Sequence, residues 1–159
     1  MTKSLYICYF GLREPLVQTQ VIPYLLEILK DGVEVSLLTF EPASEVPKLQ
    51  SYGVAKLKQE LADQGIDWHW TRYHKRPSLP ATFFDILNGA RIVRKLLKRE
   101  RYDILHARVH LPTLMAAIAR KFSKHRPKIL FDIRGFFPEE YTDAGVWPEG
   151  GWLYRAAKR

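Results

Sequence analysis

Leu5-Tyr6-Ile7-Cys8-Tyr9-Phe10, followed by Gly11, is a run of large apolar side chains with almost no polar alternation. Strands that helices cover on both faces of a parallel sheet have this pattern. Three similar runs follow at residues 33–40, 103–107 and 128–133, and a weaker one covers residues 67–73. In the weaker run, Trp68, Trp70 and Arg72 alternate with His69, Thr71 and Tyr73, as expected for a strand near a sheet edge. The sequence therefore predicts at least five strands.

Helical periodicity fills the intervals between these runs. Over residues 17–29 the apolar side chains fall on one face, and Gly32 provides a stop. Because proline is tolerated in the first turn of a helix, Pro23 predicts that the regular helix begins near Thr19. Three further helices are indicated by the apolar sets Val54, Leu57 and Leu61; Phe83, Ile86, Leu87, Ala90, Val93 and Leu97; and Leu114, Ile118 and Phe122.

The alternation of strands and helices specifies the fold class. Parallel strands joined by right-handed helical crossovers form a doubly wound α/β sheet. We expect a Rossmann-like parallel sheet of about five or more strands with helices on both faces. A chain of 159 residues with 47% apolar composition is sufficient for one domain with a hydrophobic core, so residues 1–159 are predicted to form a single domain. The last eight residues begin a helical pattern that no strand follows, which favours a chain truncated before a further domain.

Composition restricts the cellular setting and the partners. No apolar run approaches the roughly 20 residues that cross a bilayer, and the amino terminus lacks a signal-cleavage pattern, so we expect a cytoplasmic protein. Cys8 is the only cysteine in the sequence and is expected to be a small core residue. The net charge of +8 favours an anionic partner, either a phosphate-bearing substrate, an anionic membrane surface or nucleic acid. Nucleic acid is not expected, because no recognition-helix or RNP pattern accompanies the charge.

The segment after the first strand is the first candidate site, because ligands of such sheets bind beyond the carboxyl ends of the strands. Gly11 permits a close backbone turn, and Arg13 adds positive charge near the start of the next helix, where a phosphate can bind. An ordinary turn between a strand and a helix explains the same residues. No dinucleotide or P-loop glycine motif is present, which argues against those two kinds of site.

The segment after the fourth strand contains two histidines and an arginine. His106 and His110 are four residues apart, but a strand end and a loop give that spacing no fixed geometry, so no metal site is expected. His106 can be either a hydrogen-bonded core residue or a cleft residue. Arg108 is a charged residue at a buried strand end, so it needs an anion or a carboxylate as its partner.

The segment Phe131–Glu140 is the most informative candidate. Asp132 and Arg134 lie on one side of a strand that is expected to be buried, and Gly135 frees the backbone immediately beyond it. A buried aspartate and arginine are tolerated when they pair, so a structural ion pair is one interpretation. The other is a cleft that faces a substrate, with Glu139 close by.

Taken in order along the chain, these segments resemble the amino-terminal domain of family 4 glycosyltransferases, which are retaining enzymes of the GT-B architecture. The resemblance covers essentially the whole sequence. It rests on Tyr9–Gly11, Glu14–Leu25, Val33–Phe40, Tyr102–Arg108 and Phe131–Gly135, followed by Glu139, Gly145 and Trp147.

The resemblance implies an enzyme that transfers a sugar from a nucleotide-sugar donor to a glycan or polyprenyl-linked acceptor at the cytoplasmic membrane face. It implies that this domain holds mainly the acceptor and that a carboxyl-terminal domain, absent here, binds the donor, so the fragment alone is expected to be inactive. No metal or other cofactor is implied. Candidate substrate-binding residues are Gly11, Arg13, His106, Arg108, Asp132, Gly135 and Glu139.

The resemblance also assigns a catalytic role. Family members often have histidine at the positions that align with Arg108 and Arg134. Because arginine stays protonated, Arg134 cannot act as a general base. We expect it to stabilise an anion, either a phosphate or an acidic sugar, with Asp132 or Glu139 orienting it.

Two alternatives remain. A basic helix face can meet anionic lipid at the membrane or can simply be solvated; it comprises Arg91, Arg94, Lys95, Lys98, Arg99 and Arg101. The second alternative concerns the whole chain: a stand-alone nucleotide- or phospho-ligand-binding module without catalysis uses the same cleft at the strand ends.

Overall fold

The computed structural model describes residues 1–74, 78–133, 142, 148, 150, 151 and 155. Within these residues one parallel sheet has the strand order β3-β2-β1-β4-β5. The strands are β1 Lys3–Cys8, β2 Glu34–Pro42, β3 Ile66–Tyr73, β4 Ile104–Arg108 and β5 Lys128–Asp132. The order reverses between β1 and β4, which makes this the switch point of a doubly wound sheet. The Rossmann-like parallel sheet that the sequence predicts is confirmed.

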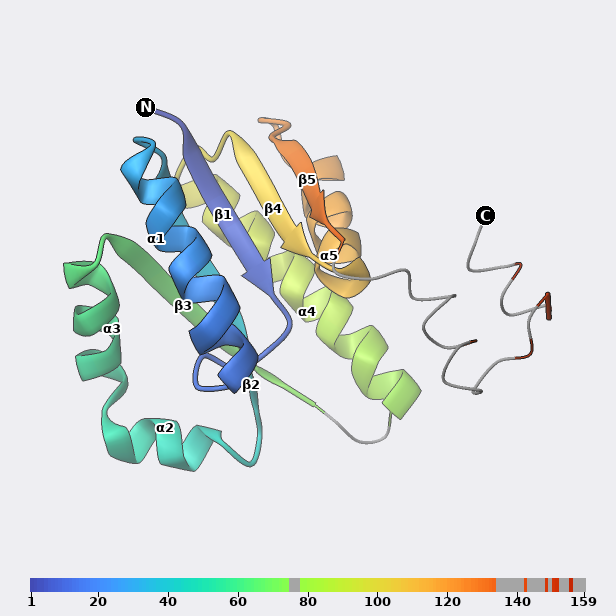
Figure 1. Cartoon of the computed structure of the whole chain (residues 1–159). Coiled ribbons are helices and arrows are strands. Elements are labelled where there is room, and N and C mark those ends of the chain that lie inside the picture. Colours follow the sequence, from blue (N-terminus) through green and yellow to red (C-terminus); the bar gives the residue numbers. More distant parts are fainter. Residues whose placement is uncertain (75–77, 134–141, 143–147, 149, 152–154, 156–159) are drawn as a thin grey trace.

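Helices cover both faces of the sheet (Figure 1). A π-helical turn, η1 (Val17–Val21), continues into α1 (Ile22–Lys30), and α1 lies on the same face as α3 (Val54–Asp63). The opposite face is covered by α4 (Ser78–Arg99) and α5 (His110–Lys121). A short helix, α2 (Val46–Tyr52), follows β2 and was not predicted from the sequence. No helix in the described part of the chain is both long and apolar enough to span a membrane.

Two hydrophobic cores hold the layers together, one on each face of the sheet. One includes Leu5, Ile7 and Val93 beneath α4 and α5, and the other includes Tyr6, Cys8 and Trp68 beneath α1 and α3. Cys8 is fully buried, as its apolar surroundings predict, and burial raises the pKa of its thiol to about 12. Alternate residues of β1 thus supply both cores, which is why this strand has a continuous apolar sequence.

The position of the first helix agrees with the sequence except at its start. The α-helix begins at Ile22 instead of near Thr19, because residues 17–21 form the wider π-helical turn. Pro23 lies in the first turn of α1, as predicted, where its missing N–H costs no hydrogen bond.

The predicted buried faces of the later helices need correction. Leu114 and Phe122 are exposed, and α5 instead buries Pro112, Met115, Ala116 and Ala119. Met115 packs closely on α4: a Cβ added at Gly89 would lie 2.5 Å from Met115 Sδ. Phe83, near the start of α4, is likewise exposed.

The last apolar run also differs from the expectation of burial on both faces. β5 is an edge strand of the described sheet, and Leu130 and Phe131 are 48% and 41% exposed. Leu130, which pairs with His106, lies on the face of this edge that α5 does not cover, whereas Phe131 lies on the α5 face, where its ring contacts His110. The alternating run at residues 67–73 forms the opposite edge, β3, as predicted.

Candidate functional site

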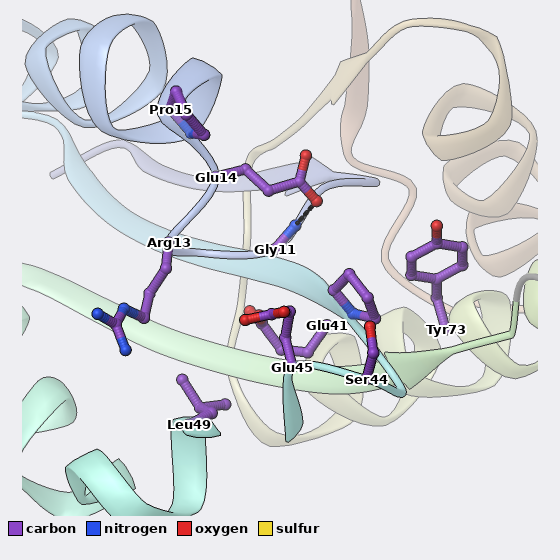
Figure 2. Close-up of a pocket in the computed structure, with 10 residues that line it drawn as sticks. Gly11, Arg13, Glu14, Pro15, Glu41, Ser44, Glu45, Leu49 and Tyr73 are labelled. Carbon is purple, nitrogen blue, oxygen red and sulfur yellow. Dashed lines mark hydrogen bonds between the residues drawn. The ribbon is translucent and has the colours of Figure 1, made fainter. Parts of the chain in front are cut away.

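The carboxyl ends of β1, β2 and β3 surround a cavity of about 500 Å³ (Figure 2). Three carboxylates and one guanidinium reach it from the end of β2 and from the loops after β1 and β2, and α2 closes one end. Its lining consists of Gly11, Arg13, Glu14, Pro15, Glu41, Pro42, Ser44, Glu45, Leu49 and Tyr73. Two of the predicted substrate-binding residues, Gly11 and Arg13, therefore lie at this cavity.

Glu41 is the most buried carboxylate of the cavity, with 2% of its surface exposed. Its Oε1 accepts hydrogen bonds from the Leu12 backbone N–H at 2.8 Å and from the Thr39 hydroxyl at 2.6 Å. The Trp68 indole donates in turn to Thr39 Oγ1 at 2.9 Å. Burial raises the pKa of Glu41, since the charged form loses its hydration. The sequence interpretation missed Glu41, although a charged residue directly after an apolar strand was a usable signal.

Gly11 is required by close packing. A Cβ at this position would lie 2.7 Å from Glu41 Oε2 and 3.1 Å from Pro42 Cδ, so a larger residue must displace the carboxylate. The Gly11 N–H donates to Glu14 Oε1 at 3.1 Å, as Figure 2 shows. Arg13 lies over the Tyr52 ring at 5.0 Å from its centroid, which places its charge at the α2 side of the cavity.

A second group of polar side chains lies at β4 and β5, on the face covered by α1. Tyr6 donates its hydroxyl hydrogen to Asp132 Oδ2 at 2.9 Å, and His106 Nε2 lies 4.0 Å from the same oxygen. The rings of Tyr6 and His106 are 4.5 Å apart. Burial raises the pKa of Tyr6 to about 12, against the opposing effect of Arg108. His106, Arg108 and Asp132, all predicted substrate-binding residues, are thus brought together.

Arg108 is the unusual member of this group. It is only 2% exposed, and its Nη2 donates to the neutral Gln20 side chain at 2.8 Å. Its Nη1 is buried without a hydrogen-bond partner in the described part of the chain. The next residue, Val109, has a φ of 59°, which a β-branched side chain rarely adopts. Gln20 belongs to the π-helical turn, a feature frequent at functional sites.

A third cluster was not predicted from the sequence. Asp85, in α4, is 1% exposed and accepts hydrogen bonds from the Tyr9 hydroxyl at 2.9 Å and from the His74 backbone N–H at 2.7 Å. Its other oxygen lies 2.8 Å from His74 Nδ1. Burial and the neighbouring Asp85 together raise the pKa of Tyr9. The available signal was an aspartate inside the apolar stripe of a helix, where it needs partners.

The remaining predicted residues lie outside the described part of the chain. These are Arg134, Gly135 and Glu139, together with Gly145 and Trp147 of the resemblance. Their roles stay predictions. Among the described residues, no group of three or more His, Cys, Asp or Glu side chains is arranged to hold a metal ion.

The sequence matches a family model. Residues 20–159 fit the model of the glycosyl transferase 4-like domain. The chain belongs to this family. This match confirms the resemblance drawn from the sequence motifs, because the family model covers most of the chain. No curated protein sequence matches it significantly.

Solved structures similar to this glycosyl transferase 4-like domain share its fold. A glycosyltransferase from Rickettsia africae ESF-5 has a TM-score of 0.52 at 18% identity, over 88% of this chain and 33% of that one. The C-terminal domain of a hydrogenase from Pyrococcus furiosus has a TM-score of 0.57 at 15% identity, over 82% of this chain and 90% of that one. The chain thus spans about a third of the Rickettsia africae glycosyltransferase. A glycosyltransferase and a hydrogenase domain share this fold, so function has to be argued from the site.

Proposed function

We propose that this glycosyl transferase 4-like domain is the acceptor-side half of a retaining glycosyltransferase. The complete enzyme would move a sugar from a nucleotide-sugar donor to a glycan or polyprenyl-linked acceptor. The observation that carries the proposal is the carboxylate-lined cavity beyond β1, β2 and β3 in a chain of this family. Ligands of doubly wound sheets bind at this edge.

The lining of the cavity suits the hydroxyl groups of a sugar. Glu14 and Glu45 are carboxylates at its wall, and such oxygens accept hydrogen bonds from hydroxyl groups. The raised pKa of Glu41 favours its neutral form, which can also donate a hydrogen bond. Leu49 and Tyr73 supply the apolar surface against which the carbon faces of a sugar ring can pack. Negative charge makes this cavity a poor site for a phosphate.

The β4 side suits an anion instead. The buried guanidinium of Arg108 has one unpaired nitrogen, and a phosphate or carboxylate of a substrate can provide the missing acceptor and the missing charge. Arg134 would supply a second fixed positive group that stabilises the departing phosphate and does not transfer a proton. Sugar and phosphate would thus be held at neighbouring strand ends.

Three parts of the proposal concern the complete enzyme. A carboxyl-terminal domain would bind the donor, and this domain alone would be inactive. The enzyme would need neither a metal nor another cofactor. Peripheral binding to the cytoplasmic face of a membrane is supported by the exposed basic side chains of α4 and its end, which are Arg91, Arg94, Lys95, Lys98, Arg99 and Arg101. Exposed Phe122 beneath Arg94 adds an apolar group to that surface.

The variant Glu45→Gln tests the cavity. In the enzyme with both domains, it is expected to raise the acceptor KM about tenfold, the scale of one hydrogen bond to a charged group, with the donor KM unchanged. Glu27→Gln is the matched control. Glu45 and Glu27 each pair with a lysine three residues later on an exposed helix surface, but only Glu45 lines the cavity.

The outcome separates the proposal from its alternative. An unchanged acceptor KM in Glu45→Gln would remove the cavity from the acceptor site. Tight nucleotide binding by the isolated chain, with no transfer to any acceptor when the second domain is present, would favour a stand-alone phospho-ligand-binding module.

A further inference from the structure

The cluster of Asp85, His74 and Tyr9 has no role in the function proposed above. It lies at the same edge of the sheet, because Tyr9 follows β1, His74 follows β3, and Asp85 is near the start of α4. Asp85 is almost completely buried, while the side chain of His74 is 40% exposed. A buried carboxylate thus holds an imidazole that reaches the surface.

The hydrogen bonds fix which nitrogen of His74 carries the proton. Asp85 Oδ2 accepts from two donors, the Tyr9 hydroxyl and the His74 backbone N–H, and we take Asp85 as a carboxylate, which can only accept. His74 Nδ1, at 2.8 Å from Asp85 Oδ1, must therefore be the N–H donor. In the neutral ring, Nε2 is then a hydrogen-bond acceptor, and it has no partner among the described residues.

The orientation of the ring is fixed as well. The Phe84 ring contacts the His74 ring edge-on, with centroids 5.4 Å apart, and the bond to Asp85 holds the opposite side. The cluster adjoins the cavity: Tyr9, which binds Asp85, packs against Tyr73 at 5.2 Å, and Tyr73 lines the cavity. His74 directly follows Tyr73 in the chain and therefore stands beside the lining of the cavity.

We propose that His74, held by Asp85, binds a hydroxyl group of the sugar acceptor through Nε2. The inference rests on the proposed function, because the hydroxyl belongs to a ligand of the adjoining cavity. A hydroxyl group suits the site since it can donate to Nε2, whereas a fully ionised phosphate cannot donate and would face the buried charge of Asp85. Asp85 acts as a positioning residue that sets the tautomer and the ring plane.

The test is nitrogen NMR of the imidazole rings in this chain, with and without methyl glycosides of the common hexoses as probes. The free chain is expected to show His74 protonated at Nδ1, and a binding glycoside is expected to move the Nε2 resonance in the direction of a newly accepted hydrogen bond. His69 is the internal control, because it also pairs with an aspartate, Asp67 at 2.9 Å, but lies within β3. Its resonances should not move.

Two variants complete the test. His74→Phe keeps a ring against Phe84 and leaves Asp85 with its bonds from Tyr9 and from the backbone, so the fold should persist while glycoside affinity falls about fivefold. Asp85→Asn is expected to lose the single tautomer of His74 in the nitrogen spectrum.

The outcomes are distinct. Shifts of the Gly11 and Leu12 amides at the cavity without any shift at His74 would overturn the inference and leave the proposed function standing. Absence of shifts at both places with every glycoside would overturn both. Protonation of His74 at Nε2 in the free chain would overturn the inference without any ligand.

Discussion

At the edge of the sheet formed by the carboxyl ends of the strands, the two halves differ in how their buried charged groups are hydrogen-bonded. On the β1–β3 side, the carboxylates of Glu41 and Asp85 are each surrounded by donors from the chain itself. On the β4 side, Arg108 is as deeply buried, yet its partners are the neutral side chains of Gln20 and Tyr6, and its Nη1 is unpaired in the described structure. An internally satisfied group stabilises the fold, whereas an unsatisfied one is suited to a ligand. The first side should therefore respond to substitution in stability and the second in binding.

The largest expected effect is on the β4 side. Arg108→Met removes the unpaired charge and keeps an unbranched chain of similar reach. In the two-domain enzyme we expect turnover to fall about 10²-fold, the usual scale for loss of a group that stabilises developing charge. The free energy of unfolding of the isolated chain should stay equal or rise, because replacing an uncompensated buried ion by an apolar side chain is often neutral or favourable. Steady-state kinetics and urea denaturation measure the two quantities.

Arg134→Ala in the same enzyme is expected to lower turnover by at least about 10²-fold, for the same reason.

The proposed difference between the two sides would be wrong if Arg108→Met keeps its turnover, or if it unfolds as readily as a variant with a new core cavity. Arg108 would then be a structural residue like Glu41.

The next effect is on the β1–β3 side. Gly11→Ala places a Cβ 2.7 Å from Glu41 Oε2 and forces the carboxylate away from its donors. We expect the free energy of unfolding to fall by about 2 kcal/mol, in the range for overpacking of a filled site. Ser44→Ala, also at the cavity lining, is the control and should unfold like the parent chain. Equal stability of Gly11→Ala would mean that the carboxylate can relocate at little cost.

Much of this fold could be predicted from the sequence. The buried strands β1, β2 and β4 have continuous apolar sequences because both of their faces are covered, and the alternating sequence of β3 matches its place at the edge. Five of the predicted site residues could be located because strand ends of a parallel sheet meet at one edge: Gly11, Arg13, His106, Arg108 and Asp132. Local pattern sufficed for these strands and for the residues at their ends.

The parts that escaped prediction depend on contacts distant in sequence. Asp85 contacts Tyr9 across 76 positions, and no periodicity encodes that contact. The predicted buried face of α5 was wrong because Gly89 leaves room on α4 for the side chain of Met115, so Met115 faces the core and Leu114 faces solvent. Leu114 and Met115 are both apolar, and the packing of α5 against α4 decides which of them is buried.

A smaller effect should appear in the pH dependence of stability. The pKa of Glu41 is raised in the folded chain, so the folded state keeps a proton that the unfolded state has lost. The contribution of Glu41 is thus fully present below the unfolded pKa of 4.5 and is lost as pH rises through the folded pKa. Glu41→Gln should remove this loss and be more stable than the parent at pH 8. Denaturation at several pH values measures it.

Glu41→Ala is the counterpart of this variant. It leaves the Leu12 N–H and the Thr39 hydroxyl without their acceptor and should lose about 1–2 kcal/mol below pH 4.5, with a smaller difference from the parent at higher pH. If Glu41→Gln were as unstable as Glu41→Ala, the carboxylate charge itself would be required. The inference that hydrogen bonds from the chain satisfy the buried groups of the β1–β3 side would then be wrong.

The smallest effect is expected at Tyr6, the buried hydroxyl of the β4–β5 side. Tyr6→Phe removes the donor to Asp132 Oδ2, while the ring keeps its contact with His106. The Asp132 side chain retains 14% exposure, so water can replace the lost donor, and we expect a loss of only about 0.5–1 kcal/mol in urea denaturation. Tyr102→Phe is the matched control, because its hydroxyl also donates across the sheet, to Ser36 at 3.0 Å, but away from the ligand edge. A loss in Tyr6→Phe as large as that in Glu41→Ala would show that the β4–β5 network carries stability. The difference in hydrogen bonding of buried charged groups between the two sides would then be confined to Arg108.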